Sequence, residues 1–166
     1  MPPEDLEESF VALLNEHSGI IKNVCSLYGA GADRQDLFQD IVYQLWRSYP
    51  SFQGHSKRST WVYRVALNTA LSSLRKRYGR PDHVPLADAA GVAACAAAAL
   101  DDRHKVVQDA IRDLNAVERA IVMLWLDDLT YRNIADILGI SEANVGVKLN
   151  RIKRKLQQRI GAPQCS

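Results

Sequence analysis

The sequence predicts an all-α protein of two small helical domains joined by a flexible linker. Apolar residues recur at intervals of three and four along most of the 166-residue chain, which places them on one face of a helix. No stretch of useful length shows the alternation expected of a half-buried strand. An Ala-rich segment with few large apolar residues separates the two helical halves, and this composition is typical of a linker.

Four helical segments are predicted before the C-terminal part of the chain, over residues 4–29, 34–49, 59–77 and 104–114. Gly19 is a candidate break in the first segment, and Asp33 is a candidate N-cap of the second. Trp46 belongs to the apolar stripe of the second segment, so we expect it in the core. The third segment ends in the basic run 75–77.

The C-terminal part is predicted to contain a helix-turn-helix. Asn115 and Glu118 have the spacing of a capping box at the start of one helix. Over residues 129–156, two further helices meet at Gly139, a residue type that tolerates a left-handed backbone, and Ser141 can cap the second of them. The last helix has an apolar stripe of Val145, Leu149, Ile152 and Leu156. Its other side is polar and basic, which is typical of a DNA-facing helix.

The net charge of +2 conceals a strong segregation of charge. Residues 1–40 hold eight acids and two bases, whereas residues 41–81 hold eight bases and no acid. Residues 82–120 return to seven acids and four bases, and residues 121–166 hold seven bases and four acids. Two basic blocks separated by acidic ones indicate two separate contacts with a polyanion, and they favour nucleic acid as the partner.

Composition also excludes several classes of protein. No apolar run is long enough to span a bilayer, and the acidic N-terminus has the wrong sign for a secretory signal, so we expect a cytoplasmic protein without membrane insertion. Cys25, Cys95 and Cys165 are far apart and lack zinc-site spacing, so neither a metal nor another cofactor is expected. Whether any of these cysteines has a redox role stays open.

An enzyme is not expected, because the four histidines are scattered and no phosphate loop, HExxH or nucleophile motif occurs. A stand-alone helix-turn-helix regulator remains an alternative. It would explain the last helices and the charge pattern, but not the acidic surface on residues 34–49 or the polar and basic loop over 52–59.

Two sets of motifs resemble the extracytoplasmic-function (ECF) sigma factors of bacterial RNA polymerase. The first set comprises Asp36-Leu-Phe-Gln-Asp40, Leu45-Trp-Arg47, Phe52-Gln-Gly54 and Thr60-Trp-Val-Tyr-Arg-Val-Ala66 with Asn68. The second comprises Leu114-Asn-Ala-Val-Glu-Arg-Ala120, Leu129-Thr-Tyr131 and Ile134-Ala135 through Ser141. The resemblance covers roughly residues 10–78 and 104–160. It implies a promoter-melting domain over 1–80, a linker over 81–103 and a helix-turn-helix domain over 104–166.

The resemblance implies a sigma factor that binds core RNA polymerase and promoter DNA under the control of an anti-sigma factor. The first domain would bind polymerase and open the −10 element, and the second would hold the −35 element. The polymerase-binding residues would be Asp36, Gln39, Asp40 and Gln44. The −10 DNA-binding residues would be Gln53, Gly54, His55, Lys57, Arg58, Trp61, Arg64, Asn68 and Arg75. Trp61 is equally compatible with a core position.

Residue chemistry suggests roles within these sets. The polar, basic loop before residue 59 precedes a helix N-terminus, where backbone amides suit phosphates. Lys57-Arg58-Ser59 departs from the family pattern, so the resemblance does not identify the base that this loop would capture. The −35 DNA-binding residues would be Asn144, Val147, Lys148, Arg151, Arg154 and Lys155. Asn144 suits adenine, Val147 suits a thymine methyl, and the cations suit guanine or phosphate.

No residues are left for a domain that senses a ligand, so control is expected to come from a partner. We expect the free protein to be compact or covered by that partner, and to extend on polymerase.

Overall fold

The computed structural model describes residues 3–79, 110–111 and 113–161, and every regular element among them is helical. The first lobe (residues 3–79) contains α1 (Pro3–Glu16), α2 (Ser18–Tyr28), α3 (Ala32–Ser48), the short 3-10 helix η1 (Tyr49–Ser51) and α4 (Arg58–Tyr78). The second lobe (residues 110–161) contains α7 (Ala116–Leu126), α8 (Tyr131–Leu138) and α9 (Glu142–Gly161). The all-α prediction is confirmed. The predicted linker, Cys95, Cys165 and most of the helix predicted over 104–114 lie outside the described residues.

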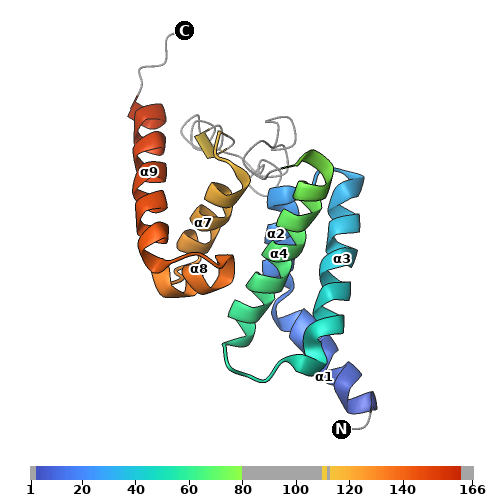
Figure 1. Ribbon diagram of the computed structural model, residues 1–166. Coiled ribbons are helices and arrows are strands. Elements are labelled where there is room, and N and C mark those ends of the chain that lie inside the picture. The colour runs from blue at the N-terminus through green and yellow to red at the C-terminus, as the bar shows by residue number, and fades with distance from the viewer. Residues whose placement is uncertain (1–2, 80–109, 112, 162–166) are drawn as a thin grey trace.

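The first lobe is a bundle in which α2, α3 and α4 run alongside one another and α1 extends from one end (Figure 1). Each long helix contributes side chains that are completely buried, such as Ile21 from α2, Ile41 from α3 and Leu67 from α4. The apolar stripes read from the sequence therefore face one another. Their burial is the main favourable contribution to the stability of the lobe.

Two predicted boundaries in this lobe are wrong. The first helical segment breaks at His17, whereas Gly19 lies inside α2, because the His17 carbonyl starts a new set of helical hydrogen bonds at Ile20. The next helix has Gly31 as its N-cap instead of Asp33. Asp33 lies in the first turn of α3, and its carboxylate accepts hydrogen bonds from Arg77 at 2.7 and 3.2 Å.

The second lobe begins with the predicted capping box. The Asn115 side chain accepts a hydrogen bond from the Glu118 amide at 2.8 Å, and the Glu118 carboxylate accepts one from the Asn115 amide at 3.2 Å. Both bonds satisfy amides at the start of α7 that have no partner within the helix. The lobe's core is formed by fully buried residues from all three helices, including Leu124, Ile134 and Leu149.

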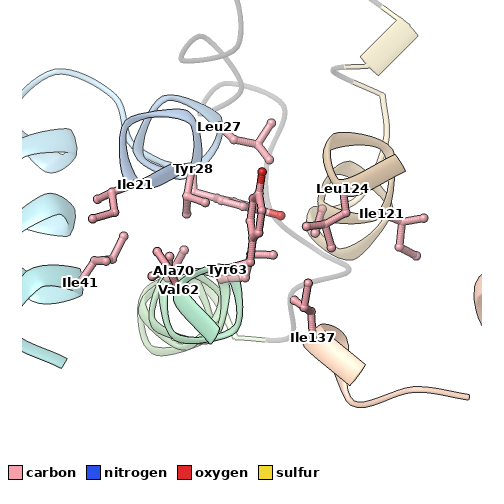
Figure 2. Packing of buried hydrophobic residues seen from close by; sticks show 14 of the residues in the cluster. Ile21, Leu27, Tyr28, Ile41, Val62, Tyr63, Ala70, Ile121, Leu124 and Ile137 are labelled. Carbon is pink, nitrogen blue, oxygen red and sulfur yellow. The ribbon is translucent and has the colours of Figure 1, made fainter. Parts of the chain in front are cut away.

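The two lobes are in contact. Helix α4 packs against α8 and α7, and the buried side chains of both lobes belong to one continuous apolar cluster. Figure 2 shows this contact, where Tyr28 and Tyr63 lie between the helices of the first lobe and Leu124 of α7. The structure is thus a closed arrangement of the two lobes.

Candidate DNA-binding and polymerase-binding surfaces

The predicted helix-turn-helix is present in α8 and α9. Gly139 has a φ of 68°, in the left-handed region that favours glycine, and its amide donates to the Ala135 carbonyl at 2.9 Å. The Ser141 hydroxyl then accepts a hydrogen bond from the Asn144 amide at 3.1 Å, which caps α9 as predicted. These local interactions fix the angle between the two helices and therefore the direction in which α9 presents its outer face.

One side of α9 is buried and the other is open to solvent. Val145, Leu149 and Ile152 are almost completely buried against the rest of the lobe. The residues predicted to contact the −35 element lie on the remaining surface: Asn144, Val147, Arg151, Arg154 and Lys155 are exposed, and Lys148 is half-buried. A helix with one anchored stripe and a polar outer face has the form needed to enter a major groove.

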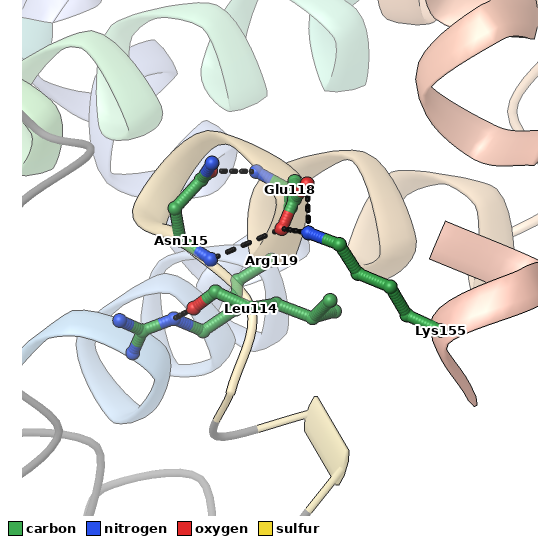
Figure 3. Close-up of polar contacts among 5 residues, drawn as sticks. All are labelled: Leu114, Asn115, Glu118, Arg119 and Lys155. Atoms are coloured by element: carbon green, nitrogen blue, oxygen red, sulfur yellow. Dashed lines mark hydrogen bonds and ion pairs between the residues drawn. The ribbon is translucent and has the colours of Figure 1, made fainter. Parts of the chain in front are cut away.

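Lys155 differs from the other cations on this surface because it is already paired. Its ammonium group lies 2.8 and 3.1 Å from the two oxygens of Glu118, whose side chain is only 12% exposed (Figure 3). Arg159, one turn further along α9, forms an ion pair with Asp113. The first pair joins α9 to the start of α7, and the second joins α9 to the turn just before α7. The Glu118 carboxylate thus serves the helix cap and the α7–α9 contact at the same time.

A cation–π contact holds a third cation of α9. The Lys153 ammonium lies 4.8 Å from the centre of the Trp125 ring, which is 39% exposed. Sequence reasoning did not detect this contact, since α7 and α9 are separated by a whole helix and only the folded lobe brings the two side chains together. Lys148, Arg151 and Arg154 have no ion-pair partner among the described residues.

The loop between η1 and α4 presents the residues predicted to contact the −10 element. Gly54 has a φ of 72°, and no atom lies within 4 Å of where its Cβ would be, so the need for glycine comes from the backbone. His55 and Gln53 form a hydrogen bond at 2.9 Å across this turn. Lys57 and Arg58 are exposed at the start of α4.

The N-terminus of α4 has no side-chain cap, because its N-cap residue is Lys57. The amides of its first turn are therefore not capped by a side chain, and they lie next to two exposed cations. Uncapped amides and positive charges both favour the binding of an anion. Arg64, Asn68 and Arg75 follow along the helix; Arg64 is half-buried, and the other two are exposed.

Trp61 occupies the core position that the sequence left open. It is 9% exposed, and its ring centre lies 4.9 Å from that of Phe52 and 6.3 Å from that of Tyr49. In this conformation it offers almost no surface on which a base could stack. Its contacts instead anchor the beginning of the loop.

Gln44 and Asp40, one turn apart on α3, border the same cavity in the seam between α3 and α4, which has a volume of about 520 Å³ and is also lined by Asn68. Gln44 and Asn68 line an adjoining cavity of about 410 Å³ as well. Asp40 also borders, with Asp36, the cleft that contains the Asp33–Arg77 pair. The four residues predicted to bind polymerase are thus distributed over different concavities.

Gln39 borders an apolar groove of about 510 Å³ between α1 and α3. The groove is lined mainly by Phe10, Val11, Phe38, Val42, Tyr43 and Trp46. The expectation that Trp46 is a core residue is wrong, because it is 38% exposed and lies in this groove, where its ring packs edge-to-face against that of Phe10 at 5.0 Å between ring centres. Tyr43 is 60% exposed. Such a cluster of exposed aromatic side chains is typical of a protein-binding surface.

Among the described residues, no group of three or more His, Cys, Asp or Glu side chains is arranged to hold a metal ion. Within the same part of the chain, no helix is both long and apolar enough to cross a membrane.

Comparisons with known proteins match both halves of the chain. The family model for sigma-70 region 2 matches residues 13–80, and the model for sigma-70 region 4 matches residues 104–156. The chain is 25% identical over 167 residues to the ECF RNA polymerase sigma-E factor of Haemophilus influenzae, covering 93% of this chain and 88% of the relative. It is 22% identical over 170 residues to the ECF RNA polymerase sigma factor SigW of Bacillus subtilis, covering 93% and 90%.

Two further matches differ in coverage. The ECF RNA polymerase sigma factor SigG of Mycobacterium tuberculosis is 29% identical over 157 residues, covering 78% of this chain but 42% of that longer protein. A solved structure of the sigma factor RpoE in complex with the anti-sigma factor NepR, from Bartonella quintana, has a TM-score of 0.65 and 18% identity, covering 97% of this chain and 99% of RpoE. This last likeness is one of fold.

Proposed function

The chain belongs to the ECF group of the sigma-70 family, and on that basis we propose that it is an alternative sigma factor that directs core RNA polymerase to particular promoters. One observation carries the proposal: a single chain combines a first lobe that matches region 2 with a helix-turn-helix lobe that matches region 4, in the order of the family. A stand-alone regulator would need only the latter. We assign region 2 to residues 1–80, the linker to 81–103 and region 4 to 104–166.

The second lobe would hold the −35 element through the outer face of α9. Asn144 would read a base edge, Val147 would contact a thymine methyl, and Lys148 and Arg151 would contact guanine or phosphate. Arg154 would contact the backbone and contribute affinity without sequence preference. We assign Lys155 chiefly to the Glu118 pair, since a neutralised cation releases fewer counterions on binding.

The first lobe would open the −10 element and hold the separated strand. The uncapped start of α4, with Lys57 and Arg58, would take phosphates, and the turn at Gly54 would let a nucleotide approach the backbone. Asn68 lines a cavity large enough for an unstacked base, next to this loop. Capturing such a base would recover part of the few kcal/mol that unstacking costs.

Polymerase would bind at α3. Gln39, Asp36 and Asp40 supply polar and acidic groups, and the groove that contains Tyr43 and Trp46 supplies aromatic anchors of the kind that dominate binding energies. Replacing Tyr43 by Ser should weaken core-polymerase binding by at least tenfold without changing DNA preference. Ile160→Ser, which alters an exposed apolar residue on the other lobe, is the matched control.

We further propose that the protein is cytoplasmic, is not an enzyme, and is controlled by an anti-sigma protein. Support comes from the relatives, which are sigma factors, and from the structural neighbour, a sigma factor bound to an anti-sigma factor. Adding a purified anti-sigma protein should suppress transcription that depends on this chain. If the anti-sigma protein and core polymerase compete for this chain, excess core polymerase should restore transcription. Suppression that core polymerase cannot reverse at any concentration would contradict such competition.

Run-off transcription with purified bacterial core polymerase and a pool of genomic promoters tests the proposal directly. Specific transcripts that require the chain are expected, and their start sites would define the −10 and −35 sequences. If the chain bound duplex DNA but neither bound core polymerase nor supported transcription, the stand-alone regulator would replace the sigma factor as the better account.

A further inference from the structure

A pocket of about 520 Å³ lies between α2 and α3 in the first lobe. Residues three and four positions apart lie on one face of a helix, so each of the two helices contributes one short stripe to the lining. The described residues that line it are Lys22, Cys25 and Ser26 of α2, Gly31 of the connection, and Arg34, Gln35 and Phe38 of α3. Helix α4, which carries most of the proposed −10 surface, contributes none of them. The pocket is therefore separate from that surface, and its volume is typical of a small-molecule site.

The only two bases of the acidic N-terminal block meet in this pocket. Residues 1–40 contain eight acids and two bases, and those two bases are Lys22 and Arg34. No acid is among the described residues that line the pocket. Neither base forms an ion pair within the part of the chain that the structure describes, although acids are abundant in the same block. The pocket thus carries two positive charges that no carboxylate of the described residues neutralises by direct contact.

Arg34 has a hydrogen-bond donor that the described residues leave without an acceptor. Its Nε atom is buried and has no hydrogen-bond partner among them. The guanidinium group lies near the thiol of Cys25: burial raises the pKa of this thiol to about 11, and the positive charge of Arg34 opposes part of the rise. A buried donor without an acceptor is unfavourable. A bound carboxylate would supply Arg34 with both an acceptor and the opposite charge.

The rest of the lining is largely apolar. Phe38 is 37% exposed, Cys25 is buried, and the alkyl stems of Lys22 and Arg34 add further apolar surface. The ring of Phe38 also borders the apolar groove between α1 and α3, so the pocket and that groove adjoin at this side chain. An inorganic anion would leave the apolar lining in contact with water, whereas an anion with an apolar body would cover it. The lining therefore favours an organic anion.

From these observations we infer that the pocket between α2 and α3 binds a small organic anion, namely a carboxylate with an aromatic or aliphatic body. Arg34 would bind the carboxylate, and the exposed Lys22 would add charge at the mouth of the pocket. Phe38 would contact the apolar body, and Ser26 and Gln35 offer further donors. The inference does not depend on the proposed function, since it rests on the first lobe alone.

Cinnamate is a suitable probe because it joins one carboxylate to an aromatic body, and cinnamamide is its uncharged counterpart of nearly the same shape. Titrating the 166-residue chain with each compound, followed by amide chemical shifts in NMR spectra, would give both affinity and location. Cinnamate should bind at least tenfold more tightly than cinnamamide, because its hydrogen bonds to Arg34 are charge-assisted. The largest shifts should occur at the amides of Ser26, Gly31 and Gln35.

Two variants test the bases separately. Arg34→Gln should weaken the binding of cinnamate about tenfold or more and leave that of cinnamamide unchanged, so that the ratio of the two affinities approaches one. Lys22→Gln alters an exposed side chain that the fold does not need, and it should weaken the binding of cinnamate about two- to fivefold. Arg47→Gln is the matched control, since it makes the same change at an exposed position of α3 outside the pocket.

Equal affinities of the wild-type chain for cinnamate and cinnamamide would overturn the inference, because the two bases would then contribute nothing. Largest shifts at Val11 and Tyr43, which border only the groove between α1 and α3, would also overturn it and place the compound in that groove. If Lys22→Gln and Arg34→Gln weakened core-polymerase binding but left the affinity for cinnamate unchanged, the bases would serve a protein interface instead. The cinnamate measurements give their answer whether or not the chain supports transcription.

Discussion

Glu118 contributes to the stability of the second lobe in two ways, and substitutions at this position should separate them. Its carboxylate closes the capping box with Asn115 and also pairs with Lys155. Loss of the hydrogen bond that the Asn115 amide donates to this carboxylate costs about 1 kcal/mol. Because the Lys155 side chain is 54% exposed, its ion pair is screened by solvent and adds about 0.5 kcal/mol. Glu118→Ala should therefore lower the free energy of unfolding by about 1.5 kcal/mol, which corresponds to about 3–6 °C in Tm.

Glu118→Gln separates the two contributions. A glutamine at this position can still accept the hydrogen bond from the Asn115 amide, so the capping box survives while the charge is lost. The Gln variant should lose about 0.5 kcal/mol, and so should Lys155→Met. Combining Glu118→Gln with Lys155→Met should cost little more than either change alone, because both remove the same ion pair.

Urea unfolding followed by far-ultraviolet circular dichroism would give these free energies, and amide hydrogen exchange at the first turn of α7 would locate the change. The Ala variant should lose protection at the Asn115 amide, which donates to the Glu118 carboxylate, whereas the Gln variant should keep most of it. Equal destabilisation by Ala and Gln would refute the capping contribution. Additive losses in the double variant would refute the pairing of Glu118 with Lys155.

Three further predictions concern charge, protonation and backbone. Lys155 and Arg159 are paired to carboxylates, so the affinity for a −35 duplex should fall with salt concentration with a slope of log K against log[salt] of about −3. Arg151→Ala should reduce the magnitude of this slope by about 0.9, whereas Lys155→Ala should change it less. Burial raises the pKa of Cys25 from its ordinary 9.0 to about 11, so stability should be constant up to about pH 9 and decline as the pH rises toward 11; Cys25→Ala should flatten this decline in urea midpoints measured across that range. Gly54→Ala forces an alanine to a positive φ and should reduce promoter opening, measured by permanganate reactivity, more than it reduces binding to polymerase.

Much of the second lobe was predictable because its determinants are local. The capping box, the left-handed residue at Gly139 and the cap at Ser141 each depend on a hydrogen bond between residues no more than four apart in the sequence. Both partners of each bond can therefore be recognised in a short stretch of sequence. The errors in the first lobe arose where local signals competed. Asp33 looks like an N-cap, but its carboxylate is used by Arg77 from the end of α4, a partner that sequence spacing does not reveal.

The surfaces were less predictable than the helices that carry them. A helical stripe gives the average direction of a face, whereas the exposure of a residue at its edge depends on which neighbour covers it. Trp46 illustrates this limit, because α1 reaches only one part of its ring and leaves the rest in a groove.

The charge pattern shows how the sequence overstates the DNA-binding surface. Six bases lie between residues 148 and 159, and all of them look available when the chain is written as a line. In the folded lobe, Lys155 pairs with Glu118 of α7, Arg159 pairs with Asp113 in the turn before α7, and Lys153 lies over Trp125. The cations that stabilise the lobe are on the side of α9 that faces α7, whereas the unpaired cations that can contact DNA are on its outer side. Cation number alone therefore does not predict the salt dependence of binding; the pairing within the lobe decides it.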